Sequence, residues 1–169
     1  MRENINLNTA WRFHKGDIAE PISQDKGFIY SQSKTERKLS GPAAYNYPDT
    51  PDSYGGGMIN PEKWVWTDLP HDYVVYQDNS ENENCALGYL HYDNAWYRKH
   101  FNMPEGSENR RALLRFDGIA GKSTVYLNGC LMYHNFSAYN TFEIDITDYV
   151  YYDKENVIAV YVNTEGFEG

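Results

Sequence analysis

The sequence has few cysteines, few basic residues and no long apolar stretch, and each shortage excludes a class of protein. Cys85 and Cys130 lie 45 residues apart, which fits neither a CxxC motif nor a disulfide-rich scaffold, so we predict two free thiols. The chain carries 15 Lys and Arg against 24 Asp and Glu, a formal net charge of -9. This excess of acid argues against nucleic acid and anionic membrane surfaces as partners. The longest apolar run, at 157–162, has six residues, whereas a membrane-spanning helix needs about 20.

The first 30 residues contain no continuous apolar stretch of the kind found in secretory signal peptides. The localisation is therefore open between the cytoplasm and a periplasmic or secreted location reached after removal of a signal peptide.

Helical periodicity is also scarce, whereas the alternation of apolar and polar residues that is typical of strands fills the second half of the chain. Asn128-Gly129 separates two such runs and favours a two-residue type I′ hairpin turn. The predicted strands are 7–14, 63–69, 95–102, 111–116, 123–127, 130–134, 141–146 and 155–162. Short strands at this spacing predict an all-β fold, a β-sandwich or jelly roll of two antiparallel sheets.

The length of 169 residues is that of one domain, and we expect a single domain over 1–169. Within it, residues 31–60 have little periodicity and include three prolines and a run of three glycines. We predict a long irregular insertion there. Its tyrosines at 45, 47 and 54 favour a loop that packs on another part of the protein.

The residues offer little for catalysis or for metal binding. There is no GxSxG nucleophile motif, and the five histidines are scattered singly. Residues 78–84 place oxygen ligands at alternate positions, but Glu83 stands where an EF-hand loop needs glycine. A solvated acidic loop is the better interpretation. We predict no cofactor and keep a structural calcium ion as the alternative.

Aromatic residues are abundant, with 16 Tyr, 7 Phe and 4 Trp. The aromatics on predicted strands fit a sandwich core. Tyr89, Tyr92 and Tyr139 stand beside glycine or in loops, where a ring can either lie on the surface or stack on the apolar face of a sugar.

Several segments, taken in order, resemble the N-terminal domain of glycoside hydrolase family 2, the β-galactosidase and β-glucuronidase family. They are Trp11-Arg12-Phe13-His14, Leu69-Pro70-His71-Asp72-Tyr73, Gly88-Tyr89-Leu90, Ala95-Trp96-Tyr97-Arg98, Leu114-Arg115-Phe116-Asp117-Gly118, Val125-Tyr126-Leu127-Asn128-Gly129, Tyr139-Asn140-Thr141-Phe142-Glu143 and Glu155-Asn156-Val157-Ile158. The sequence departs from the family pattern at 136–138, which replaces the usual Gly-Gly, and at Thr141, which replaces the usual Pro. These departures put the local loop shape, and with it the substrate preference, in question.

The resemblance implies a jelly-roll domain that precedes an immunoglobulin-like domain and a (β/α)₈ barrel, with both catalytic carboxylates on the barrel. A barrel needs about 250 residues, more than this chain contains. We therefore assign no catalytic residue here, and expect an accessory domain of a retaining β-galactosidase-like exo-glycosidase without activity of its own. Its partners would be the barrel of the same polypeptide and a carbohydrate, either a β-galactoside or a β-glucuronide. A free-standing carbohydrate-binding module and a purely structural domain are the alternatives.

By the same resemblance, two segments reach the sugar: the loop at 88–94 and the segment at 163–168. The candidate substrate-binding residues are Tyr89, His91, Asp93, Asn163 and Glu165. Tyr89 would stack or donate a hydrogen bond, His91 would bind a hydroxyl, and the other three would accept from hydroxyls. His71-Asp72 is expected to fix a turn rather than to bind substrate.

Overall fold

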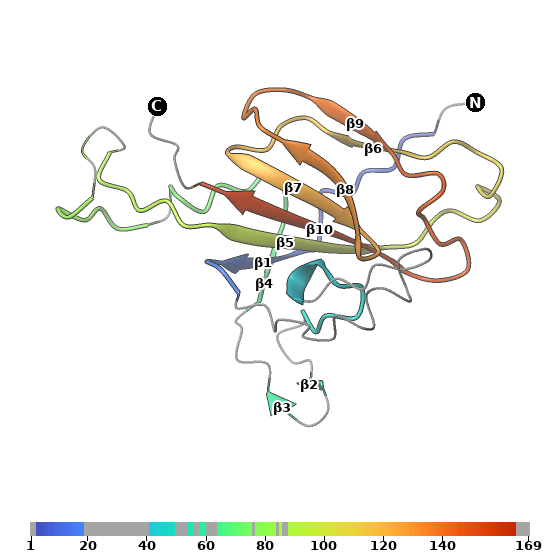
Figure 1. Cartoon of the computed structure of the whole chain (residues 1–169), viewed down its shortest axis with the longest axis horizontal. Coiled ribbons are helices and arrows are strands. Elements are labelled where there is room, and N and C mark those ends of the chain that lie inside the picture. The colour runs from blue at the N-terminus through green and yellow to red at the C-terminus, as the bar shows by residue number, and fades with distance from the viewer. Residues whose placement is uncertain are drawn as a thin grey trace, which may run out of the picture.

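Antiparallel strands make up nearly all the regular structure in the computed structural model, which describes residues 3–18, 41–49, 54–55, 58–59, 64–75, 77–83, 85 and 88–164. The elements are β1 (Trp11–Lys15), η1 (Gly41–Ala43), β2 (Tyr54–Gly55), β3 (Met58–Ile59), β4 (Val65–Thr67), β5 (Ala95–Phe101), β6 (Leu113–Phe116), β7 (Lys122–Leu127), β8 (Cys130–Asn135), β9 (Phe142–Asp145) and β10 (Asn156–Asn163). The only regular helical turn in the described part of the chain is η1, so the predicted all-β jelly-roll fold is confirmed (Figure 1).

Two antiparallel layers form the sandwich. Six strands make the larger sheet in the order β4-β1-β5-β10-β7-β8, and β6 pairs with β9 to form the second layer. Val125, Ile158 and Val160 of the larger sheet pack with Leu114 and Ile144 of the β6–β9 pair in one buried cluster. Alternate residues of each strand point into this cluster, as the period of two predicts.

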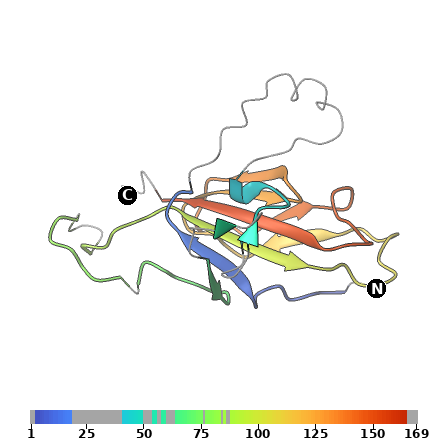
Figure 2. The ribbon, with the colours of Figure 1, turned by 90° about the horizontal axis from the view of Figure 1, so that it is seen from below.

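The opposite face of the larger sheet is also covered. Trp96 of β5 and Ala159 of β10 pack there against Ile18, Ala43 and Trp64, and both views place η1 against this face (Figures 1 and 2). Burial on both faces explains why β10 is an almost uninterrupted apolar run, because a strand covered on one side only would alternate.

A buried ion pair holds residues 41–49 on this face. Arg98 of β5 is fully buried; its Nε donates to Asp49 Oδ2 at 2.6 Å and its Nη1 donates to the carbonyl of Ala44 at 3.0 Å. Arg12 also donates to Asp49, and His100 Nε2 lies 2.8 Å from Asp49 Oδ2. Burial by itself would raise the pKa of Asp49, but the His100 hydrogen bond and the Arg98 charge outweigh it and lower the pKa to about 2. Both tyrosines of this segment are packed. The Tyr45 hydroxyl donates to the carbonyl of residue 155 at 2.8 Å, and the Tyr47 ring lies 6.0 Å from the ring of Trp64.

The predicted hairpin turn is present between β7 and β8. Asn128 and Gly129 have φ angles of 52° and 82°, the positive values that a type I′ turn requires. The Asn128 side chain also accepts a hydrogen bond from the Val157 amide at 2.9 Å, which ties the turn to β10.

The predicted free thiols are confirmed, because neither Cys85 nor Cys130 is in a disulfide. In the described ranges, no helix has the length and apolarity needed to span a bilayer.

Candidate functional site at one end of the sandwich

Several loops gather at one end of the sandwich because the strand registers bring them there. Ala95, the first residue of β5, pairs with both Lys15 and Val162, while Ser123 of β7 pairs with Val162 and with Asn135. The end of β1, the start of β5, the end of β10, the start of β7 and the end of β8 therefore lie side by side. The loop at 88–94 and the loop at 136–141 both leave the sandwich here, at the end where the C-terminus is labelled in Figure 1.

A polar network centred on His91 occupies this end. Its Nδ1 lies 2.9 Å from Glu83 Oε1 and its Nε2 lies 2.8 Å from Asp93 Oδ1. Lys15, the last residue of β1, places Nζ 2.8 Å from Asp93 Oδ2. Gln77 Nε2 donates to the His91 carbonyl at 2.8 Å. The network thus joins the end of β1 to the loop that leads into β5.

The side chains of this network are partly exposed to solvent. The hydrogen bond to Glu83, followed by the negative charge of Asp93, raises the pKa of His91 above its ordinary value. The His91 side chain is 56% exposed and that of Asp93 25%. An imidazole between two carboxylates, with a lysine on one of them, presents both donors and acceptors to a ligand that binds at this end.

A second set of hydrogen bonds fixes the backbone on which the network stands. Asn94 is buried, its Nδ2 donates to Asp17 Oδ2 at 3.0 Å, and its Oδ1 accepts from the Thr164 amide at 3.0 Å. The Tyr161 hydroxyl donates to Asp17 Oδ1 at 2.6 Å. The ends of β1, β5 and β10 are thereby connected, which keeps Asp93 and its neighbours in one arrangement.

The structure brings some of the predicted site residues together. His91 and Asp93 are in direct contact, and Asn163 ends β10 at the same end of the sheet, paired with Lys122. Tyr89 is exposed in a turn at 88–89 with a φ of 59°, beside a hollow of about 500 Å³ formed with residues 79–81. Glu165 lies outside the described residues. The sugar-binding roles of these residues remain predictions.

Sequence reasoning missed four members of the site: Lys15, Asp17, Gln77 and Asn94. It treated Glu83 only as part of an acidic loop. The one usable signal was the place of Lys15 and Asn94 at strand ends, since side chains there project from the same end of a sheet. Their interaction partners are distant in the sequence, so no local sequence pattern predicts these contacts.

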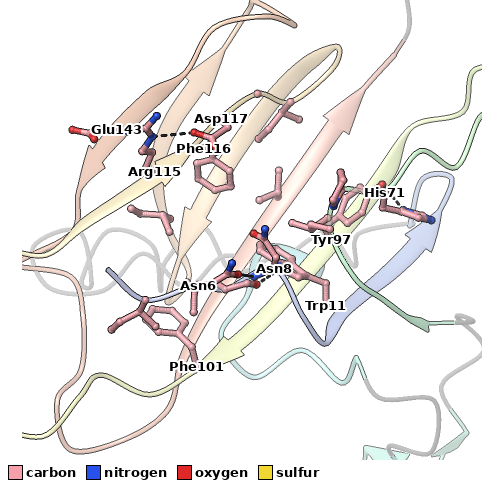
Figure 3. Close-up of a pocket in the computed structure, with 18 of the residues that line it drawn as sticks. Asn6, Asn8, Trp11, His71, Tyr97, Phe101, Arg115, Phe116, Asp117 and Glu143 are labelled. Carbon is pink, nitrogen blue, oxygen red and sulfur yellow. Dashed lines mark hydrogen bonds and ion pairs between the residues drawn. The ribbon is translucent and has the colours of Figure 1, made fainter. Parts of the chain in front are cut away.

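A large cavity opens between the two layers of the sandwich. It has a volume of about 1610 Å³. Figure 3 shows Tyr97 and Phe101 of β5 and Phe116 of β6 turned toward this space. The lining combines these aromatic side chains with polar ones, among them Asn6, Asn8, Arg115 and Glu143.

His71 and Asp72 border this cavity with separate structural contacts. His71 Nδ1 lies 3.0 Å from the Tyr97 hydroxyl, and burial lowers the pKa of His71. Asp72 Oδ1 accepts from the Val74 amide at 3.0 Å. The turn-fixing role expected for this pair therefore belongs to Asp72.

Within the described ranges, no group of three or more His, Cys, Asp or Glu side chains is arranged to hold a metal ion. The calcium alternative at 78–84 includes Asn84, which lies outside those ranges, and it stays a prediction.

Comparison with known proteins gives consistent relatives. The family described as the glycosyl hydrolase 2 galactose-binding domain-like family matches residues 61–167. A β-glucuronidase of Formosa agariphila is 27% identical over 97% of this chain and 14% of its own length. The β-galactosidase BoGH2A of Bacteroides ovatus is 27% identical over 96% of the chain and 15% of its own.

Solved structures agree with these sequence relatives. A β-glycosidase from Bacteroides vulgatus has a TM-score of 0.69 and 25% identity, over 95% of this chain and 17% of its own. A glycosyl hydrolase family 2 member from Bacteroides cellulosilyticus has a TM-score of 0.66 and 27% identity, over 94% of this chain and 17% of its own. The chain spans only about one seventh of the length of the first curated relatives.

Proposed function

The chain belongs to the glycosyl hydrolase 2 galactose-binding domain-like family, and from that membership we propose that it is the N-terminal accessory domain of a retaining exo-glycosidase. In this proposal the domain packs on a catalytic barrel and forms one wall of its substrate pocket. The observation that carries the proposal is the exposed network of Lys15, Glu83, His91 and Asp93 at one end of the sandwich. The small share of each relative that the chain covers supports a role beside a larger catalytic unit.

The chemistry of the network suits sugar hydroxyls, which both donate and accept hydrogen bonds. His91 and Lys15 supply N–H donors, and Glu83 and Asp93 supply carboxylate acceptors. These side chains already pair with one another at the surface, so a bound sugar exchanges partners with them instead of leaving a buried charge unpaired. The exposed ring of Tyr89 offers an apolar face in the same loop.

The same carboxylates do not serve as a catalytic pair in this proposal. A retaining glycosidase needs an acid and a nucleophile about 5–5.5 Å apart on opposite sides of the glycosidic bond. Glu83 and Asp93 are instead both bound to one imidazole, which holds them for binding. The reactive groups would come from the barrel.

Charge favours a β-galactoside over a β-glucuronide as the substrate. The relatives at 27% identity include enzymes named for each sugar, so similarity alone does not decide. Asp17, Glu83 and Asp93 outnumber the cations Lys15 and His91 at this end, and the whole chain has a net charge of -9. The carboxylate of a glucuronide would meet like charge here, whereas galactose is neutral.

Kinetics of the complete gene product that contains this chain would test the proposal. Asp93→Asn keeps the shape of the side chain but removes the charge that holds Lys15 and His91. Hydrogen bonds to charged groups contribute about 1.5–3 kcal/mol, so we expect KM for a β-galactoside to rise roughly tenfold or more, with kcat less affected. The matched control is Asp145→Asn, which should leave KM unchanged because Asp145 is the last residue of β9, at the end of the strand away from the site.

The alternatives give different results in the same set of experiments. If Asp93→Asn behaves as the control does, the network is not part of the pocket. Tight calorimetric binding of galactosides by the 169-residue chain alone would support a free-standing carbohydrate-binding module. Turnover of a chromogenic galactoside by that chain would contradict the assignment of the catalytic groups to another domain.

A further inference from the structure

Two aromatic side chains stand almost fully exposed in the loop between β8 and β9. Phe136 is 79% exposed and Tyr139 is 92% exposed, the highest values among the large hydrophobic side chains of the described residues. Two such rings within four residues cost free energy in water unless something covers them. The role proposed above for the His91 network does not use them.

The loop that carries these rings has a fixed shape. Asn135 is buried at its start; its Nδ2 donates to the Ser137 carbonyl at 2.8 Å and its Oδ1 accepts from the Ser137 amide at 3.3 Å. At the other end, the Thr141 hydroxyl donates to the Asp117 carbonyl at 3.2 Å. A loop held at both ends presents its rings with little conformational entropy left to lose on binding.

A stack of aromatic rings lies beneath the loop. Tyr133 of β8 stacks on Phe142 of β9 with ring centroids 4.8 Å apart, and Phe142 stacks on Phe116 at 5.1 Å. The His134 ring lies 6.3 Å from that of Phe136. Phe136 therefore follows a strand whose own aromatic side chains are packed, and its ring lies next to that of His134.

The loop opens at the same end of the sandwich as the His91 network. The strands β8, β7, β10 and β5 are successive neighbours in the larger sheet. Three steps between strands separate the end of β8 from the start of β5, a distance of roughly 14 Å. That separation is longer than one sugar ring and suits a short oligosaccharide lying across the strand ends.

We propose that Phe136 and Tyr139 form a sugar-stacking platform that binds the leaving-group side of an oligosaccharide β-galactoside, while the His91 network binds its terminal galactose. This inference rests on the proposed function for the choice of sugar. The side chains between and after the rings are small, and all but that of Ala138 are polar: Ser137, Ala138, Asn140 and Thr141. They can hydrogen-bond to hydroxyls but give no continuous apolar surface of the kind found at the centre of a protein interface.

The test compares two substrates of the complete gene product. β-Galactosyl fluoride has no sugar on the leaving-group side, whereas a trisaccharide with a terminal β-galactose has two. Replacing both rings (Phe136→Ala with Tyr139→Ala) should raise KM for the trisaccharide about tenfold, since each lost aromatic contact weakens binding several-fold. KM for the fluoride should not change.

Two further variants separate stacking from other effects. Tyr149→Ala removes a half-exposed ring at the opposite end of the sandwich and should affect neither substrate. Phe136→Tyr keeps a ring at the platform and should retain trisaccharide affinity.

An unchanged trisaccharide KM in the double variant would overturn the proposal. An equal loss for both substrates would also overturn it, because it would mean that the rings form a contact with a protein domain. Failure of the proposed function has a different signature: Asp93→Asn would then leave the fluoride KM unchanged.

Discussion

Replacing Asp49 by Asn should destabilise the fold strongly, because it leaves the Arg98 guanidinium buried without a counter-charge. Arg98 is fully buried and Asp49 is 3% exposed, so neither charge can turn to water. Removing one partner of a buried ion pair costs about 3–5 kcal/mol. Asn has nearly the volume of Asp, so the loss reports the charge and not a cavity.

The pH dependence of stability gives a second measure of the same ion pair. The pKa of Asp49 is about 2 in the folded protein, against an ordinary value of 3.8. A lowered pKa means that the ionised carboxylate contributes stability above about pH 4 and loses it as the pH falls through about 2. The shift corresponds to roughly 2–3 kcal/mol. The difference between wild type and Asp49→Asn should therefore shrink in this acid range.

Urea unfolding followed by tryptophan fluorescence would measure both effects, because Trp64 and Trp96 pack on the face that Asp49 covers. Asp145→Asn is the control. The hydrogen bond from the Thr147 hydroxyl, with help from Arg111, lowers the pKa of Asp145 also to about 2, yet Asp145 is solvent-exposed. Its replacement should cost far less. A loss within about 1 kcal/mol for Asp49→Asn, the range of ordinary surface substitutions, would refute the reasoning.

Three further predictions concern the site and the strand ends. Glu83→Gln should lower the raised pKa of His91 toward its ordinary value in an NMR titration, and an unchanged pKa would show that another group raises it. In the wild type, the stability that charged His91 contributes is lost as the pH rises through that raised pKa. Gly121→Ala should lower the free energy of unfolding in urea by about 1–3 kcal/mol, because φ is 86° and a Cβ would lie 2.8 Å from the Asn163 carbonyl oxygen; wild-type stability would contradict this. Asn128→Ala removes three side-chain hydrogen bonds from the β7–β8 turn and should lower the free energy of unfolding by about 2–3 kcal/mol in the same assay. A decrease below about 0.5 kcal/mol would contradict this, because it would mean that these bonds add little net stability.

Most of the second half of the fold could be predicted from the sequence because its signals are local. Alternation places Phe142 and Ile144 on the core side of β9, and Asn128-Gly129 marks the hairpin. The predicted strand at 7–14 is partly wrong, since β1 begins only at Trp11. Ala10 has a φ of 54°, which alanine rarely adopts and which the sequence therefore does not predict. This left-handed residue interrupts the extended chain before β1.

The outer face of the larger sheet could not be predicted in the same way. Arg98 sits in a strand where alternation gives no reason to expect a buried cation, and its partner Asp49 is 49 residues away. The candidate site shows the same division. His91 and Asp93 are two residues apart and follow from the loop, whereas Lys15 joins them only because β1 pairs with β5.

A crystal structure of the complete gene product with a galactoside bound would test the central claim most directly. The account predicts a sugar hydroxyl within hydrogen-bonding distance of His91 or Asp93, with the catalytic carboxylates supplied by another domain. A sugar bound far from the start of β5, with no group of this chain in contact with it, would contradict the account.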